Sequence, residues 1–504
     1  MLEVIQQAVK PHDRYQVEIK LDYELLNERD TQYRVSTYLF IPQTLGLTPD
    51  SYSKGDFYRD VQNYIRLKTP GLGLRELSEG RHAPLAQIER LIQTVGWDQN
   101  PELATQVINH CKLLSATLKS AIREHFNLIE RRIAEAASGA DVQQLIQSLI
   151  AEFLLRTDRI AATYRAFFPA FNLPHVDKAV FTAYSLTDES IGLLIEESAI
   201  ELFPIVAAHC AGECRADFLR QLNERVAQET GHRRAHGYGS LLKVGEENET
   251  YMFRASVLKK YAATVLHLTT TVQREGRWLE QLLLAVAAGI AMAFATILAF
   301  YVQQNYGNFT FPVFVALVVG YMFKDRIKEL GRQLFAGKLQ DRLYDRRLQI
   351  KTLDGKHKLA IVREKVSFVS PAHLPRPVVK ARSADSLVAL DNDGQGETII
   401  CYTKDVTLFA AAFKRAFAEL PHVSGLNDII RYDIRAYLKK MDEPVEQRSY
   451  LANEQLHSVT CHRVYHLNLV SRYRVVRPQK EKRHTRLRLV LNRQGIKRIE
   501  HIHV

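Results

Sequence analysis

The sequence is poor in cysteine, and its first residues do not have the pattern of a signal peptide. Its 504 residues include only 5 cysteines, an odd number spread thinly along the chain, which excludes a disulfide-stapled secreted scaffold and favours a reducing compartment. The first twenty residues carry several charged side chains and no apolar run of signal-peptide length. We therefore expect no cleavable signal, and we expect the part of the chain before the first membrane segment to stay in the cytosol.

Catalytic signatures are also lacking. The sequence contains no Gly-x-Ser-x-Gly elbow, no His-Glu-x-x-His helix and no protein-kinase set. Gly71–Gly73 lacks the further glycines and the lysine of a phosphate loop, and Asp391–Gly394 lacks the flanking ligands of a calcium loop, so it is expected to be a hairpin turn. The sequence predicts no cofactor and argues against an enzyme. An enzyme whose site residues converge only in the folded chain stays open.

Histidine and cysteine occur in two loose groups that have the residue types of a zinc site. The groups are His209, Cys210, Cys214, His232 and His236, and His457, Cys461, His462, His466, His501 and His503. The first group does not have the spacing of a zinc finger, and the segment inside it reads as one helix that would hold its two halves apart. The even spacings in the second group indicate only a shared strand face. We expect no metal site in either group.

Charge is absent from one long stretch in the middle of the chain. Residues 281–323 contain no Asp, Glu, Lys or Arg over 43 positions. Within this stretch, 282–302 is an apolar run of 21 residues, and a helix needs about 20 to cross a hydrocarbon core. A polar turn at 303–308 separates it from a shorter apolar segment at 309–323. The sequence predicts a two-helix transmembrane hairpin. A re-entrant hairpin and a pair of buried helices in a soluble core are the alternatives.

The flanks of this hairpin predict its orientation. Lys259, Lys260, Arg274 and Arg277 precede it, and Lys324, Arg326, Lys328 and Arg332 follow it. The turn carries no charge, and positive residues near the ends of a span are retained on the cytoplasmic side. We therefore expect a multi-pass protein of a plasma or inner membrane, with both termini and both soluble parts in the cytosol. No ionisable group lies inside the hairpin, which favours an anchor over an ion or proton pathway.

Small residues recur along the first apolar segment. Ala285, Gly289 and Ala293 are spaced by four, which places them on one helix face and is the spacing that lets membrane helices approach closely. They are candidate residues for membrane-helix packing, including packing between two copies of the chain. An alanine-rich composition that lipid simply tolerates is the alternative.

Hydrophobic periodicity divides the remaining chain into two soluble parts. Residues 1–254 are expected to form an N-terminal domain, with strand-like alternation at 15–41 that predicts a β-hairpin and helical stripes thereafter that predict a bundle. Residues 255–280 are expected to continue as a helical stalk into the membrane. After the hairpin, 324–344 is expected to be a basic amphipathic helix.

Residues 345–504 are predicted to form a basic α+β domain rich in antiparallel strands. Strand pairs are expected within 347–369, 386–402 and 457–504, and helices at 408–420 and 426–441. The expected fold class is a membrane-anchored α + β protein, with an N-terminal helical bundle, a two-helix transmembrane hairpin and this C-terminal domain.

Charge is distributed unevenly along the chain. The net charge is +12, but the residues after position 323 carry +16 and those before position 324 carry −4. The segment 463–498 alone has twelve basic residues against one acid. This polarity indicates an anionic partner near the C-terminal part.

Part of this basic segment is predicted to form a cationic strand face. The candidate anion-binding residues are Arg472, Arg474, Arg477, Arg483, Arg486 and Arg488. Pairs two apart project from one face of a strand, and the alternate positions Tyr473, Val475, Leu487 and Leu489 are expected to face the core. Such a face can bind phosphates of lipid headgroups or of nucleic acid. A solvated basic face without a ligand is the alternative.

Together these features predict an integral membrane protein whose partner is the lipid bilayer and which serves as a non-enzymatic scaffold or sensor at the membrane surface. Anionic lipid headgroups, other proteins and a second copy of the chain are candidate further partners. The alternative from another class is a membrane-tethered binder of nucleic acid or another polyanion through the basic strands.

Overall fold

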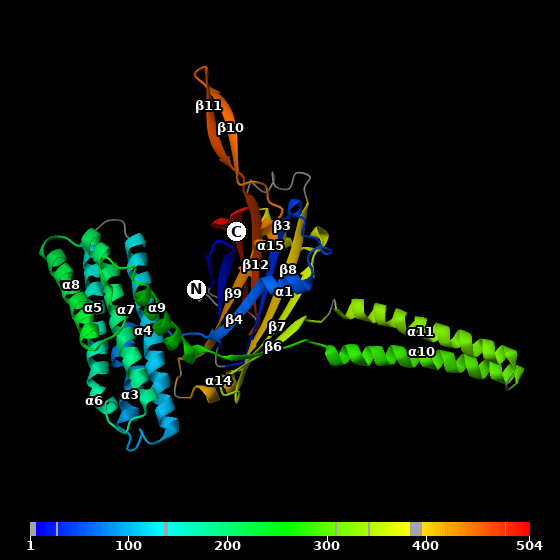
Figure 1. Ribbon diagram of the computed structural model, residues 1–504, viewed down its shortest axis with the longest axis horizontal. Helices are drawn as coiled ribbons and strands as arrows, with labels where there is room; N and C mark the ends of the chain where they lie inside the picture. Colours follow the sequence, from blue (N-terminus) through cyan, green and yellow to red (C-terminus); the bar gives the residue numbers. More distant parts are fainter. Residues whose placement is uncertain are drawn as a thin grey trace. The chain divides into compact units, whose positions relative to one another are not determined.

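The computed structural model of the chain describes residues 7–26, 29–135, 140–307, 310–340, 343–383, 396–418, 420, 422–478 and 480–503. In these residues the fold is a mixture of helices and antiparallel sheets (Figure 1). Two compact units are present, and each combines segments that are distant in sequence. The sheet unit contains residues 1–65, 269–412 and 427–504, and the helical unit contains residues 66–268 and 413–426.

The N-terminal strands belong to the sheet unit, not to a separate domain at 1–254. β2 (Gln16–Glu24) lies in a smaller sheet, whereas β3 (Thr31–Pro42) lies in a larger sheet and pairs with β12 (Tyr465–Arg477). The expected hairpin at 15–41 is therefore wrong, although both strands exist. Alternation predicts a strand and its buried face but not its partner, and Thr37 of β3 lies opposite Ser471, 434 positions further along the chain.

Two sheets form the framework of the sheet unit. The larger sheet has the order β14-β13-β12-β3-β8-β7-β6-β5, and the smaller sheet has the order β1-β2-β9-β4. Every neighbouring pair in the larger sheet is antiparallel. The remaining bounds are β1 (Gln7–Pro11), β4 (Val61–Leu67), β5 (Thr269–Gln273), β6 (Arg346–Lys351), β7 (Lys358–Phe368), β8 (Glu397–Leu408), β9 (Gly425–Asp433), β13 (Lys480–Asn492) and β14 (Gly495–Ile502). The predicted inward residues of β12 and β13, which are Tyr473, Val475, Leu487 and Leu489, are all buried.

Shorter elements complete the sheet unit. β10 (Val445–Ala452) and β11 (Gln455–His462) form a two-stranded hairpin in which nearly every residue is exposed. The short helices of this unit are α1 (Lys54–Asp60), α12 (Arg376–Arg382) and α15 (Arg435–Leu438). A further short helix, α14 (Ala410–Ala416), begins in the sheet unit and ends in residues assigned to the helical unit. The helix expected at 408–420 is thus shorter, and the strand expected near 386–390 and the turn at 391–394 lie outside the described residues.

Two expected helices are replaced in part by strands. The stalk at 255–280 does not form, because α9 (Glu249–Ala263) ends and the chain continues as β5 before the next helix begins. The threonines of β5 are β-branched and prefer a pleated strand, and β6 supplies the ladder. In the range of the helix expected at 426–441, the first half belongs to β9 and the only helix is the short α15. The even positions 426 to 432 of β9 are buried, in alternation with Ile429 and Arg431. In both segments, pairing with a neighbouring strand outweighed the local preference of the sequence for a helix.

The interior of the sheet unit contains a buried polar centre. Lys404 of β8 places its Nζ 2.5 Å from Oδ2 of Asp428 on β9 and 3.6 Å from Oε1 of Glu364 on β7. Glu364 also accepts hydrogen bonds from the Tyr402 hydroxyl at 2.8 Å and from Nδ2 of Asn63 on β4 at 2.6 Å. These contacts join strands of both sheets. Burial and the nearby Glu364 charge raise the pKa of Tyr402 well above its ordinary value, so its hydroxyl keeps the proton that it donates.

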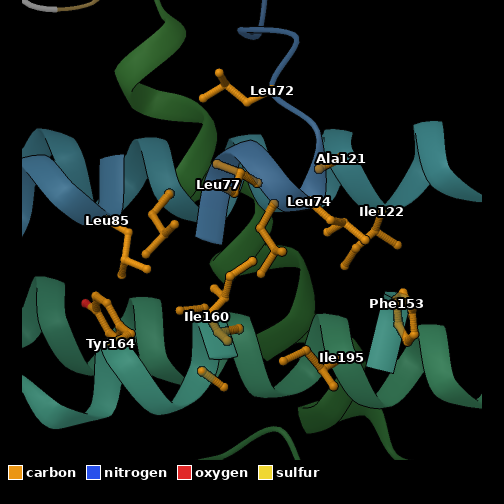
Figure 2. Packing of buried hydrophobic residues seen from close by; sticks show 14 of the residues in the cluster. Leu72, Leu74, Leu77, Leu85, Ala121, Ile122, Phe153, Ile160, Tyr164 and Ile195 are labelled. Atoms are coloured by element: carbon orange, nitrogen blue, oxygen red, sulfur yellow. The ribbon is translucent and has the colours of Figure 1, made fainter. Parts of the chain in front are cut away.

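Long helices build the helical unit. Their bounds are α2 (Leu74–Glu79), α3 (Pro84–Ile92), α4 (Pro101–Glu135), α5 (Ala140–Ala166), α6 (Phe168–Phe171), α7 (Lys178–His209) and α8 (Gly212–Ala235), followed by α9. Figure 2 shows Leu74, Leu77 and Leu85 of α2 and α3 facing Phe153 and Ile160 of α5 across the core. A helical stripe at 142–154 provides this buried face of α5, so the prediction of helices in this region is confirmed.

Charged side chains are buried beside this apolar core. Asp188 of α7 accepts hydrogen bonds from Arg165 Nε at 2.9 Å and from the Tyr238 hydroxyl at 2.9 Å, and its Oδ2 lies 2.7 Å from Nε2 of His232. Arg165 also contacts Glu229 at 2.6 Å, and both acids are almost completely buried. The network ties α5, α7 and α8 together, and each buried charge has a partner of opposite sign.

The helical unit should lose stability in acid through Asp188. Burial acts to raise the pKa of Asp188, but the hydrogen bond from His232 and the charge of Arg165 outweigh it, so the pKa lies below its ordinary value. A depressed folded-state pKa contributes stability above the unfolded value of about 3.9, and this contribution is lost as the pH falls through the folded pKa. Asp188→Asn should therefore destabilise the unit at pH 7 by about 3–5 kcal/mol and flatten the pH dependence of its melting temperature below pH 4.

The matched control for this prediction is Asp217→Asn on α8. Asp217 pairs with Arg220 on the exposed side of the same helix, so its substitution removes the same charge without opening a buried network. Melting followed by circular dichroism from pH 7 to pH 2 compares the two variants. Equal melting curves for the two variants would contradict the role given to Asp188.

Candidate functional site

The uncharged stretch forms a helical hairpin. α10 (Arg277–Tyr306) and α11 (Phe311–Gln340) pack against each other (Figure 1), with the rings of Phe294 and Phe323 6.4 Å apart and Gly320 next to Ala295. The two predicted helical segments therefore exist. The basic helix expected at 324–344 is not a separate element, because α11 continues through Lys324 without a break.

The contact between the two helices uses small residues, but not the predicted ones. Ala287 and Ala291 are buried at 3% and 0% exposure, whereas Ala285, Gly289 and Ala293 are exposed and nothing lies within 4 Å of a Cβ built on Gly289. Both sets have four-residue spacing and differ by two positions, which is about 200° around the helix. Spacing alone could not determine which set faces α11. Contact of the exposed set with another chain stays a prediction.

Most of the hairpin surface is apolar and uncovered. One described helix, over Gln281–Asn305, is long and apolar enough to cross a membrane, and only 11% of its most apolar window is buried in the protein. The large exposed side chains of the hairpin include Leu282, Val286, Ile290, Met292, Phe294, Ile297, Phe300, Phe311, Phe314, Leu317, Val318, Met322 and Phe323. An apolar surface of this extent marks a contact with lipid or with another protein.

Both ends of the hairpin return to the same sheet edge. β5, which precedes α10, pairs antiparallel with β6, which follows α11, and Gln273 lies opposite Arg347. Glu275 forms a salt bridge with Arg363 of β7 at 3.3 Å. Asp345 accepts hydrogen bonds from Lys54, Tyr58 and the backbone of Val366, at 2.8, 3.1 and 2.7 Å. The chain therefore leaves the sheet and re-enters it between two adjacent strands.

The joint between β5 and α10 requires a glycine. Gly276 has φ +77°, a left-handed conformation, and a Cβ built on it would lie 2.2 Å from Cδ1 of Leu343. Both the backbone angle and the close approach disfavour any other residue. A side chain at this position would require Leu343 or the backbone to shift.

The second candidate feature is a basic patch on the outer face of the larger sheet. Register places Arg472 opposite Ser36 and Arg474 opposite Arg34, so side chains of β12 and β3 lie on one face. These four residues line a small hollow. Arg34 is held by two hydrogen bonds to Asp405 of β8, at 2.6 and 2.7 Å. We call these four residues the arginine hollow.

The structure brings only part of the predicted arginine set to this hollow. Arg472 and Arg474 line it, and Arg477 and Arg483 are exposed near the adjoining ends of β12 and β13. The assignment of Arg483 to the same face is wrong, because register places it opposite the buried Tyr473 and thus on the other face of the sheet. Arg486 and Arg488 do not belong to an accessible face, because they are buried at 1% and 4% exposure.

The burial of these two arginines has a local cause. Arg486 donates from Nη1 to the backbone oxygen of Ala381 in α12 and from Nη2 to Oδ1 of Asn468, at 3.3 and 3.1 Å. Arg488 pairs with Glu500 of β14 at 3.2 Å. Strand alternation assigned them to the right face, but the packing of α12 over Phe40, Tyr38 and Val470 on that face could not be foreseen.

Sequence patterns missed Arg34 and Ser36. Both occupy outward positions of β3, alternating with the buried Tyr33 and Val35, and that alternation was the available signal. Nothing local indicated that β3 pairs with β12. The hollow is thus built from residues more than 430 positions apart in the sequence.

The histidines and cysteines that were considered as metal ligands form no metal site among the described residues. Among the described residues no group of three or more His, Cys, Asp or Glu side chains could hold a metal ion, and the five cysteines are free thiols. Comparison of the chain with protein-family models, with curated proteins and with solved structures found no match in any of the three.

Proposed function

We propose that the chain is an integral membrane protein anchored by the α10–α11 hairpin, and that it acts as a non-enzymatic scaffold or sensor on the cytosolic surface of a plasma or inner membrane. The observation that carries the proposal is the uncovered apolar surface of α10, which is long enough to cross a hydrocarbon core. Exposing this surface to water would be costly at about 25 cal/mol per Å² of apolar area. The bilayer is the partner that covers both helices at once.

The strand pairing supports two crossings and not one. Because β5 and β6 are adjacent in one sheet, the chain enters the membrane and leaves it on the same side. A single crossing would separate the two paired strands by the thickness of the bilayer. α11 is apolar from Phe311 to Phe323, and Lys324 can extend along the interface to lengthen the crossing.

The flanking charges support the cytosolic side for the soluble units. Lys324, Arg326 and Lys328 follow the apolar part of α11, and Arg274 and Arg277 precede α10. The turn between the helices carries no charge. By the preference of positive flanks for the cytoplasmic side, both termini are cytosolic.

Thiol labelling tests both the crossing and the orientation. Cys461 is an exposed native cysteine of β11, and Gln304→Cys places a second thiol in the turn of the hairpin. In intact cells a membrane-impermeant maleimide should label Gln304→Cys, whereas Cys461 should react only after permeabilisation. Cys461→Ser identifies the native signal.

Two results would contradict this proposal in different ways. Labelling of Cys461 in intact cells would place the sheet unit outside. Failure of Gln304→Cys to react until permeabilisation would favour a re-entrant hairpin that does not cross.

A further inference from the structure

The arginine hollow has the features of a built site for one anionic group. Its volume is about 80 Å³, well below the roughly 300–1,000 Å³ of pockets that enclose a whole small molecule. Three arginines and one serine line it. A cavity of this size and composition accommodates a single charged group that belongs to a larger ligand or to a small free ion.

The charges around the hollow are not balanced within the described part of the chain. Asp405 pairs with Arg34, but no described carboxylate pairs with Arg472 or Arg474. In addition, the Nε of Arg472 is buried and has no hydrogen-bond acceptor. A buried donor without a partner costs about 1–3 kcal/mol, and an acceptor bound beside Arg472 would relieve this cost.

The surrounding sheet adds to the positive potential. Register places Arg474 and Arg34 in one row with Asp405, Arg363 and Arg347. Neighbours in such a row lie about 5 Å apart on one face. The row holds four cations and one acid, and Glu275 pairs with Arg363 from beside it, so the local charge stays positive and attracts anions toward the hollow.

We infer that the arginine hollow binds a phosphoryl group, carried by an anionic lipid headgroup or by a free phosphate compound. Guanidinium groups match the oxygens of a phosphate by paired hydrogen bonds, and Arg34 is already held in place by Asp405. Ser36 adds a hydroxyl that also lies 3.2 Å from Thr403 Oγ1. In its lipid form the inference rests on the proposed membrane anchoring, and in its free-phosphate form it does not.

Binding to the full-length protein in a neutral detergent tests this inference. The probes are inorganic phosphate, short-chain dioctanoyl phosphatidic acid and a 20-base-pair duplex, measured by calorimetry at one fixed salt concentration. Wild type should bind phosphate and phosphatidic acid, and Arg472→Gln with Arg474→Gln should weaken both at least tenfold. Phosphatidic acid binding tenfold more tightly than phosphate would assign the group to a lipid, and similar affinities would assign it to a free phosphate compound.

A matched double variant separates the hollow from general charge. Arg448→Gln with Arg493→Gln removes the same charge from exposed positions of the same unit and should change binding less than twofold. An equal loss in this control would overturn the inference. So would binding of the duplex without binding of phosphate or phosphatidic acid, which would assign the face to nucleic acid.

Membrane retention after an alkaline wash reports separately on the anchor. It should be the same for wild type and for Arg472→Gln with Arg474→Gln. If the wild-type protein were not retained, the proposed membrane anchoring would be wrong, but binding of a free phosphate compound in the hollow would be unaffected.

Discussion

Replacing residues 276–343 with a Gly-Asn-Gly linker should release the protein from the membrane without unfolding the sheet unit. β5 and β6 are adjacent antiparallel strands, so a short turn can join them. The linker keeps Glu275, which binds Arg363, and Asp345, which binds Lys54 and Tyr58. The wild-type chain should remain in the pellet after an alkaline wash, and the shortened chain should move almost entirely to the supernatant with an unchanged melting temperature.

Point variants test the same anchor without deleting it. Ile290 and Ile297 are exposed on α10 at 56% and 68%, and a lysine at the centre of a membrane helix costs about 2.5–3.5 kcal/mol. Ile290→Lys with Ile297→Lys should therefore oppose insertion by roughly 5–7 kcal/mol. Val272→Lys makes the same kind of change at an exposed position of β5 and should leave membrane retention intact. Equal retention of all three proteins would mean that the hairpin is not the anchor.

The hairpin could be predicted from the sequence because its signal is local. Forty-three uncharged residues and one polar turn are visible without any knowledge of the rest of the chain. The buried faces of β12 and β13 could be predicted equally well, because the alternation of residues such as Tyr473 and Leu487 follows from strand geometry alone.

Features that depend on distant partners could not be predicted. Alternation placed Arg486 on the outer face, but only the position of α12 determines that this part of the face is covered. The helical signal after Thr264 was overridden by a pairing of β5 with β6, across the whole hairpin. The arginine hollow needs the pairing of β3 with β12, so two of its four residues carried no functional signal in the sequence.

Lys404→Met should be among the most destabilising single substitutions in the sheet unit. The side chain of Lys404 is fully buried, and its ammonium group contacts the carboxylates of Asp428 and Glu364. Methionine has a similar shape but leaves the two buried carboxylates without this cation. Breaking a buried ion pair in this way costs about 3–5 kcal/mol, which lowers the melting temperature of a domain of this size by roughly 6–20 °C.

The charge mechanism makes this loss depend on Asp428. Without Lys404, the buried carboxylates of Asp428 and Glu364 lose the cation that they share. Adding Asp428→Asn should recover part of the stability, because it removes one uncompensated charge. Lys356→Met, in the exposed turn before β7, is the matched control and should melt like wild type. If Lys404→Met melted like this control, or if adding Asp428→Asn recovered no stability, the polar centre would not depend on the charge of Lys404.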